Sequence, residues 1–99
     1  MTIDLNKNGK ALTVKLTGRL DTATSPDLDK IISEELDDIT ELTFDIHALE
    51  YTSSAGLRVF LKAQKIMNSK GSMKITGAIQ SVYEIFEMTG FDEIMNIEQ

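Results

Sequence analysis

The chain has no cysteine and only one histidine among its 99 residues. Without cysteine there is no disulfide framework, no thiolate nucleophile and no sulfur ligand for a metal, so redox chemistry by its side chains is excluded. The one histidine, His47, follows a predicted strand, where such a residue usually forms a surface or half-buried hydrogen bond. The absence of a second histidine leaves little material for acid–base catalysis.

Long apolar runs and positive net charge are also missing. No segment is apolar enough to cross a bilayer, and the N-terminus lacks the basic start and apolar run of a signal peptide, so we expect a cytoplasmic protein without membrane insertion. The net charge of −6 repels phosphate backbones and argues against DNA or RNA as the main partner. A hydrophobic content of 41% and a charged content of 26% are typical of an ordinary globular protein.

The length and the hydrophobic pattern predict one domain over residues 1–99. Alternating apolar residues predict a hairpin of two strands that reverses at Asn8-Gly9. Further strands are predicted after each helix, which gives strands over residues 2–5, 11–17, 42–46, 73–76 and 94–97.

Three helices are predicted between these strands. The first covers residues 26–36, with Ser25 as its cap and Pro26 in its first turn. The second covers residues 54–69, and the third begins at a capping box of Ser81 and Glu84 and is closed by Gly90. We therefore predict an α/β fold: one small domain with a mixed, mostly parallel sheet of about five strands, three or four helices and an N-terminal β-hairpin.

Enzymatic and cofactor motifs are not found in this pattern. The chain lacks a Gly-x-Ser-x-Gly elbow and a Walker sequence, so neither a hydrolase nor a nucleotide site is indicated. Adjacent acidic residues such as Asp37-Asp38 and Asp92-Glu93 point different ways and do not form a metal site. Four methionines are expected to fill gaps in the core rather than to hold a cofactor: Met67, Met73, Met88 and Met95. We expect no cofactor, no metal and no catalysis.

Two serines, Ser53 and Ser54, lie where the third predicted strand passes into the second helix. Either one can be the helix cap, and the Ser54 hydroxyl can alternatively be a phosphorylation site at the positive end of the helix. The apolar residues that follow are more numerous than one sheet can cover: Leu57, Val59, Phe60 and Leu61. They either form an exposed docking patch beside the serines or are buried by the neighbouring helices and the hairpin.

Several short motifs together resemble those of the STAS domains, in particular the bacterial anti-sigma-factor antagonists. The motifs are Leu16-Thr-Gly-Arg-Leu-Asp21, Phe44-Asp-Ile46 with Leu49, Tyr51-Thr-Ser-Ser-Ala-Gly-Leu57 and Met88-Thr-Gly-Phe91. The resemblance covers almost the whole chain and implies a mixed sheet with a phosphorylatable serine at the start of the second helix.

In the family, that serine is phosphorylated by an anti-sigma factor that is itself a serine kinase, and the resemblance assigns this role to Ser54. It implies that the unmodified protein binds the kinase and releases the sigma factor, that phosphorylation breaks the complex, and that a PP2C-type phosphatase restores it. Asp21 matches an acidic turn residue near the serine loop. Ser53 occupies the place of the usual aspartate and Ala55 that of a second hydroxyl, so Ser53 is an alternative acceptor.

Three hypotheses follow. The first is an anti-sigma-factor antagonist switched by phosphorylation of Ser54, with a partner-binding surface of Asp21, Thr22, Ala23, Thr24, Ser53, Ser54, Gly56, Leu57 and Arg58. The second is a STAS interaction subunit, for example of a lipid-transport ABC system, in which Ser54 is only a cap. The third is a small enzyme or nucleotide binder, which calorimetry with ATP and GTP tests.

Overall fold

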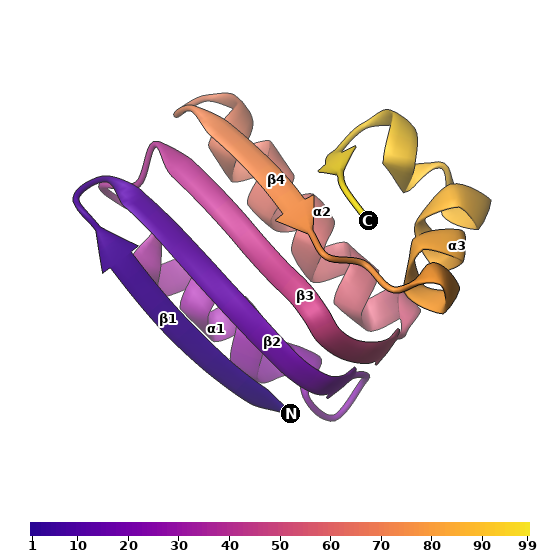
Figure 1. Cartoon of the computed structure of the whole chain (residues 1–99). Coiled ribbons are helices and arrows are strands. Elements are labelled where there is room, and N and C mark those ends of the chain that lie inside the picture. Colours follow the sequence, from indigo (N-terminus) through magenta and orange to yellow (C-terminus); the bar gives the residue numbers. More distant parts are fainter.

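The computed structural model describes all residues, 1–99, as a single sheet with helices packed against it (Figure 1). The elements follow one another as β1 (Thr2–Asn8), β2 (Ala11–Leu20), α1 (Ser25–Glu35), β3 (Glu41–Thr52), α2 (Ser54–Asn68), β4 (Ser72–Thr76), α3 (Gln80–Thr89), a 3-10 turn (Phe91–Glu93) and β5 (Asn96–Ile97). The predicted α/β class, the hairpin and the three helices are confirmed.

The five strands lie in the order of the sequence, β1-β2-β3-β4-β5. β1 and β2 pair antiparallel across the tight turn at Gly9, whose φ of +63° suits glycine. The other neighbours pair in parallel, since a helix separates each strand from the next. Consequently β2 and β3 end at the same edge of the sheet.

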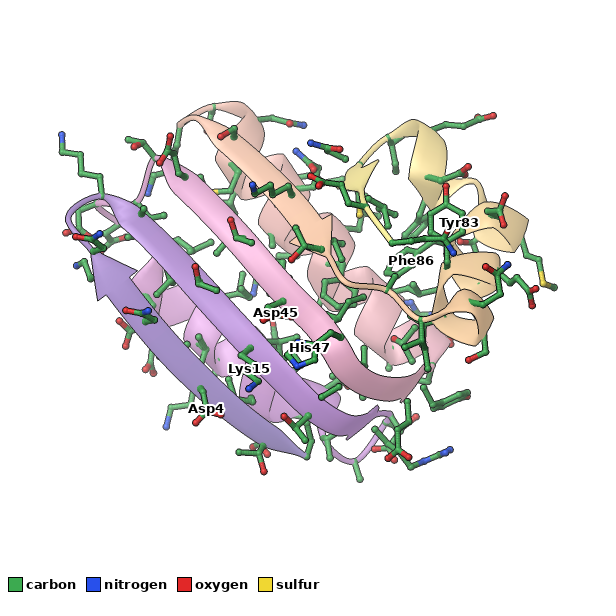
Figure 2. All side chains as sticks on the ribbon, in the orientation of Figure 1. Asp4, Lys15, Asp45, His47, Tyr83 and Phe86 are labelled. Carbon is green, nitrogen blue, oxygen red and sulfur yellow. The ribbon has the colours of Figure 1, made fainter.

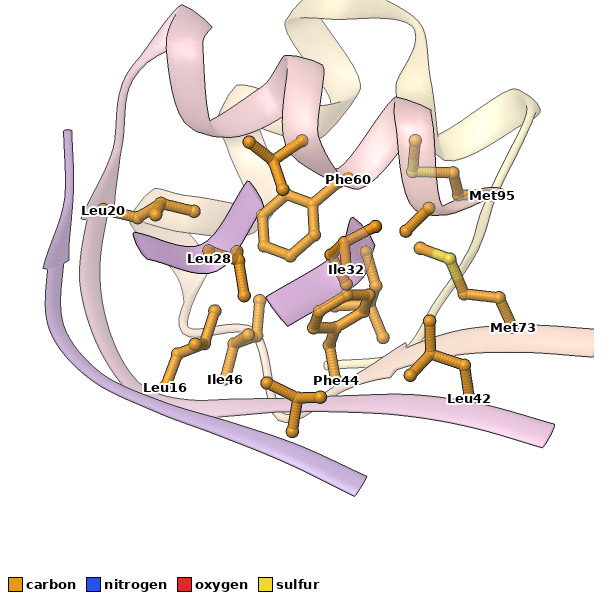
Figure 3. Packing of buried hydrophobic residues seen from close by; sticks show 14 of the residues in the cluster. Leu16, Leu20, Leu28, Ile32, Leu42, Phe44, Ile46, Phe60, Met73 and Met95 are labelled. Atoms are coloured by element: carbon orange, nitrogen blue, oxygen red, sulfur yellow. The ribbon is translucent and has the colours of Figure 1, made fainter. Parts of the chain in front are cut away.

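The core lies between the sheet and the helices α1 and α2, which cover one face (Figure 1). Inward residues of β2 and β3 meet inward residues of both helices (Figure 3). Phe60 of α2 is fully buried, with its ring 5.0 Å from that of Phe44 and 5.7 Å from that of Phe86. These three rings join the middle of α2 to β3 and α3.

Several predicted boundaries were wrong. β3 extends to Thr52 rather than ending at residue 46, so His47 lies within the strand and not beyond it. The cap of α1 is Thr24, while Ser25 is the first helical residue and is buried. α3 begins at Gln80 after Ile79, so the capping box of Ser81 does not form. β5 contains only two residues.

The methionines follow the prediction with one exception. Met67, Met73 and Met95 are buried, but Met88 is 86% exposed on α3. Gly90 closes α3 in the left-handed conformation, as predicted.

Candidate functional site

The candidate site lies where β2 and β3 end side by side. Leu20 pairs with Thr52, and the backbone N–H of Ser53 donates a hydrogen bond to the carbonyl oxygen of Leu20, with an N···O distance of 2.9 Å. The chain then turns into α1 after Leu20 and into α2 after Ser53. Parallel pairing therefore brings the Asp21–Thr24 loop and the two serines to one edge, although they are about thirty residues apart in sequence.

The Asp21–Thr24 loop is held by its own side chains. Asp21 Oδ1 accepts hydrogen bonds from the backbone N–H groups of Ala23 (3.0 Å) and Thr24 (3.1 Å), and Thr24 Oγ1 accepts one from the backbone N–H of Asp21 (2.9 Å). The backbone N–H and the hydroxyl of Thr24 hold the pKa of the Asp21 carboxyl below its ordinary value. The loop is thus ordered in advance, with Thr22 and Ala23 exposed at its tip.

The two serines have different roles in the structure. Ser53 is the N-cap of α2, and its Oγ accepts a hydrogen bond from the backbone N–H of Gly56 at 3.4 Å. Ser54 is the first residue of the helix, is exposed, and its hydroxyl has no hydrogen-bond partner within the protein. The second hypothesis, in which Ser54 is the cap, is wrong on this point.

Gly56 lies under the junction in close contact with both strand ends. A Cβ atom at this position would lie 2.5 Å from Thr52 Oγ1 and 2.7 Å from Leu20 Cγ. Since these distances are shorter than side-chain contacts allow, only glycine lets α2 start so close to β2 and β3.

Of the two alternatives for the apolar residues of α2, the exposed docking patch is wrong and burial by neighbouring elements is confirmed. Leu57, Val59 and Phe60 are buried and Leu61 is half-buried against the core, because the sheet, α1 and α3 cover more of α2 than the sequence pattern indicated. Leu57 is only 5% exposed. Gly56 and Leu57 therefore shape this edge from beneath, whereas Ser54 and Arg58 form its exposed part.

A groove of about 370 Å³ runs between the N-terminal parts of α1 and α2. It is lined by Ser25, Pro26, Asp29, Ala55, Arg58, Val59 and Lys62. Lys62 Nζ bonds Asp29 Oδ1 at 2.7 Å and Ser33 Oγ at 2.8 Å, which connects the two helices across the groove. Arg58 has no ion pair within the protein.

One contact beside the site, between exposed Arg19 and half-buried Tyr51, was not singled out from the sequence. The guanidinium of Arg19 lies 4.4 Å from the ring centroid of Tyr51, on the ends of β2 and β3 next to the Asp21–Thr24 loop. Both residues belonged to the motifs at this edge, but their contact depends on a shift in strand register between Gly18 and Arg19.

The only histidine lies on the uncovered sheet face, with Asp4, Lys15 and Asp45 nearby (Figure 2). His47 Nδ1 is 2.6 Å from Asp45 Oδ1, and this contact holds the pKa of the Asp45 carboxyl below its ordinary value. The two serines contact neither residue, and no group of three acidic or histidine side chains is arranged to hold a metal ion. None of the helices combines the length and apolar character needed to span a bilayer.

Comparison with known proteins identifies the family. The model of the STAS domain matches residues 2–99, so the chain belongs to the STAS domain family. The anti-sigma-B factor antagonist of Staphylococcus aureus is 26% identical over 101 residues, which cover 100% of this chain and 94% of that protein.

Solved structures share the fold. An anti-sigma factor antagonist from Mycobacterium paratuberculosis superposes with a TM-score of 0.89 at 19% identity, over 98% of this chain and 84% of that one. The phosphorylated form of the Bacillus cell fate determinant SpoIIAA superposes with a TM-score of 0.78 at 16% identity, over 99% and 92% of the two chains.

Proposed function

We propose that this STAS domain is a cytoplasmic anti-sigma-factor antagonist. In its unmodified form it binds an anti-sigma factor that is a serine kinase, and the bound sigma factor is released. Phosphorylation of Ser54 ends this binding, and a PP2C-type phosphatase restores it. The domain is the substrate of both enzymes and has no catalytic activity of its own.

The observation that carries the proposal is the difference between the two serines. Ser53 Oγ is engaged as a helix cap, whereas Ser54 Oγ is exposed and unbonded at the first position of α2. A kinase reaches the Ser54 hydroxyl without breaking a hydrogen bond of the fold. The named relatives support the same function, because they are anti-sigma-B factor antagonists and one protein of similar fold exists in a phosphorylated form.

The transfer is an ordinary phosphoryl transfer from ATP. Ser54 Oγ attacks the γ-phosphorus, the Oγ–P bond forms, the bond from that phosphorus to the ADP oxygen breaks, and the hydroxyl proton passes to a base of the kinase. The phosphatase returns the serine by hydrolysis of the Oγ–P bond with water. No residue of this chain acts as acid or base.

Electrostatics explain how a small group changes binding without unfolding the domain. A phosphoryl group adds about −1.5 to −2 charges at the positive end of α2, where the helix dipole favours a negative charge. The same charge opposes a partner surface that is apolar or acidic at this point. The contact residues that we propose are Asp21, Thr22, Ala23, Thr24, Ser53, Ser54 and Arg58, with Gly56 and Leu57 beneath them.

The modification is tested by intact-mass analysis and peptide mapping after incubation with ATP and the serine-kinase anti-sigma factor of the organism that encodes this chain. Wild-type protein is expected to gain one phosphoryl group at Ser54, Ser53→Ala to gain the same group, and Ser54→Ala to gain none. Phosphorylation of Ser54→Ala at Ser53, or an unchanged mass of the wild-type protein, contradicts the proposal.

A further inference from the structure

Arg58 lies one helical turn after Ser54 on the exposed side of α2. Residues four positions apart in a helix are neighbours on its surface. The Cα–Cβ bonds of a helix tilt toward its N-terminus, so a long side chain at position 58 extends back toward position 54. Both side chains are exposed, and neither forms a side-chain hydrogen bond or an ion pair with another residue of the chain.

The groove between α1 and α2 contains two cations, Arg58 and Lys62, and only Lys62 has bonding partners within the protein. Lys62 is held by Asp29 and Ser33, with distances of 2.7 and 2.8 Å. Arg58 lines the same groove but forms no ion pair, although its guanidinium carries five donors. It is therefore a cation without a counter-ion, four positions along α2 from the hydroxyl that we propose is phosphorylated.

We propose that Arg58 is the counter-ion of phosphorylated Ser54 and clamps the phosphoryl group against the first turn of α2. This inference rests on the proposed function and extends it to regulation of the same site. A planar guanidinium can give two parallel N–H···O bonds to a phosphoryl group, which a lysine ammonium cannot do. The pair forms within one helix and needs no movement of the backbone.

The clamp gives phosphorylation a second effect on the docking surface. In the unmodified protein the Arg58 guanidinium is free to meet an acidic or carbonyl group of the partner. In the phosphorylated protein the phosphoryl group occupies the same guanidinium, so the partner loses a cationic contact and also meets added negative charge. Asp29 and Lys62 are the other charged groups of the groove, and they already neutralise each other.

The test uses protein in which phosphoserine is installed at position 54 during translation, so that no kinase is involved. The second ionisation of the phosphoryl group is followed by phosphorus NMR from pH 4 to 8. We expect Arg58 to lower this pKa, so that Arg58→Gln raises the midpoint by roughly half a unit, and raised salt reduces the difference. Arg58→Lys should give an intermediate midpoint, because it keeps the charge and loses the fork.

Lys65→Gln is the matched control, since it removes the same charge from α2 farther from Ser54. It should leave the midpoint unchanged. Equal midpoints for wild type and Arg58→Gln overturn the clamp, as does an equal shift in Lys65→Gln. Circular dichroism of each variant confirms that it is folded. The result is independent of whether a kinase modifies Ser54, so failure of the clamp and failure of the proposed function are distinguishable.

Discussion

The backbone N–H of Ser53 donates a hydrogen bond to the carbonyl oxygen of Leu20, with an N···O distance of 2.9 Å. This bond joins the last residue of β2 to the cap of α2. It places the preorganised Asp21–Thr24 loop beside the free hydroxyl of Ser54. The candidate site is thus a property of parallel strand pairing, and it depends on close packing beneath the junction.

Gly56→Ala tests that close packing. In an open helix position alanine is about 1 kcal/mol more favourable than glycine. Here the added methyl group would overlap Leu20 and Thr52, so we expect the free energy of unfolding to fall by about 1–3 kcal/mol. Urea denaturation measures the change, and a stabilised Gly56→Ala protein would show that the junction is loose.

The aspartate of the loop should titrate below its ordinary range. Because hydrogen bonds lower the folded pKa of Asp21, its stabilising effect is fully present at pH above the unfolded pKa and is lost as the pH falls through the folded pKa. Thr24→Val removes the hydroxyl but keeps the backbone N–H, so it should raise the pKa part of the way. Carbon NMR of the Asp21 carboxyl gives the midpoint.

Thr22→Val is the control for that titration, because Thr22 is exposed and does not bond the carboxylate. Its midpoint should equal that of the wild type. An ordinary midpoint for Asp21 in the wild type would mean that the loop is not held by these bonds.

The aromatic contacts under α2 predict a large difference between two substitutions. Phe60→Ala removes a fully buried ring and should lower the free energy of unfolding by about 3–5 kcal/mol. Met88→Ala removes a side chain that is 86% exposed and should change it by less than about 0.5 kcal/mol. Chemical denaturation compares them, and similar losses would contradict the described core.

The fold was largely predictable because hydrophobic periodicity determines the type of each element. The ends of the elements were harder to predict where the hydrophobic periodicity breaks. β3 was predicted to end near residue 46, because the alternation of apolar and polar residues is lost after that point. The structure explains the loss, since the pairing of β2 with β3 shifts register between Lys15 and Thr17. The cap of α1 was misplaced by one residue because Asp21 and Thr24 close the loop before Ser25.

The sequence also predicted that the two serines lie where a strand passes into a helix, but it did not predict which neighbouring residues are exposed. A stripe containing Leu57, Val59 and Phe60 indicates apolar character without saying how many elements cover it. The sheet, α1 and α3 together bury these apolar residues, which depends on tertiary packing. The exposed residues at this edge are therefore Ser54 and Arg58. Similarly, either serine could cap a helix on propensity, and only the backbone geometry assigned the cap to Ser53.

We expect the charge at residue 54 to control binding to the serine-kinase anti-sigma factor, and calorimetric titration of that kinase measures the affinity. Ser54→Ala should bind like the wild type, whereas Ser54→Asp should bind at least about tenfold more weakly, a loss of about 1.4 kcal/mol. Ser81→Asp, the same change in the exposed first turn of α3, should bind like the wild type. Equal affinities for Ser54→Asp and Ser54→Ala would show that charge at this position does not control binding.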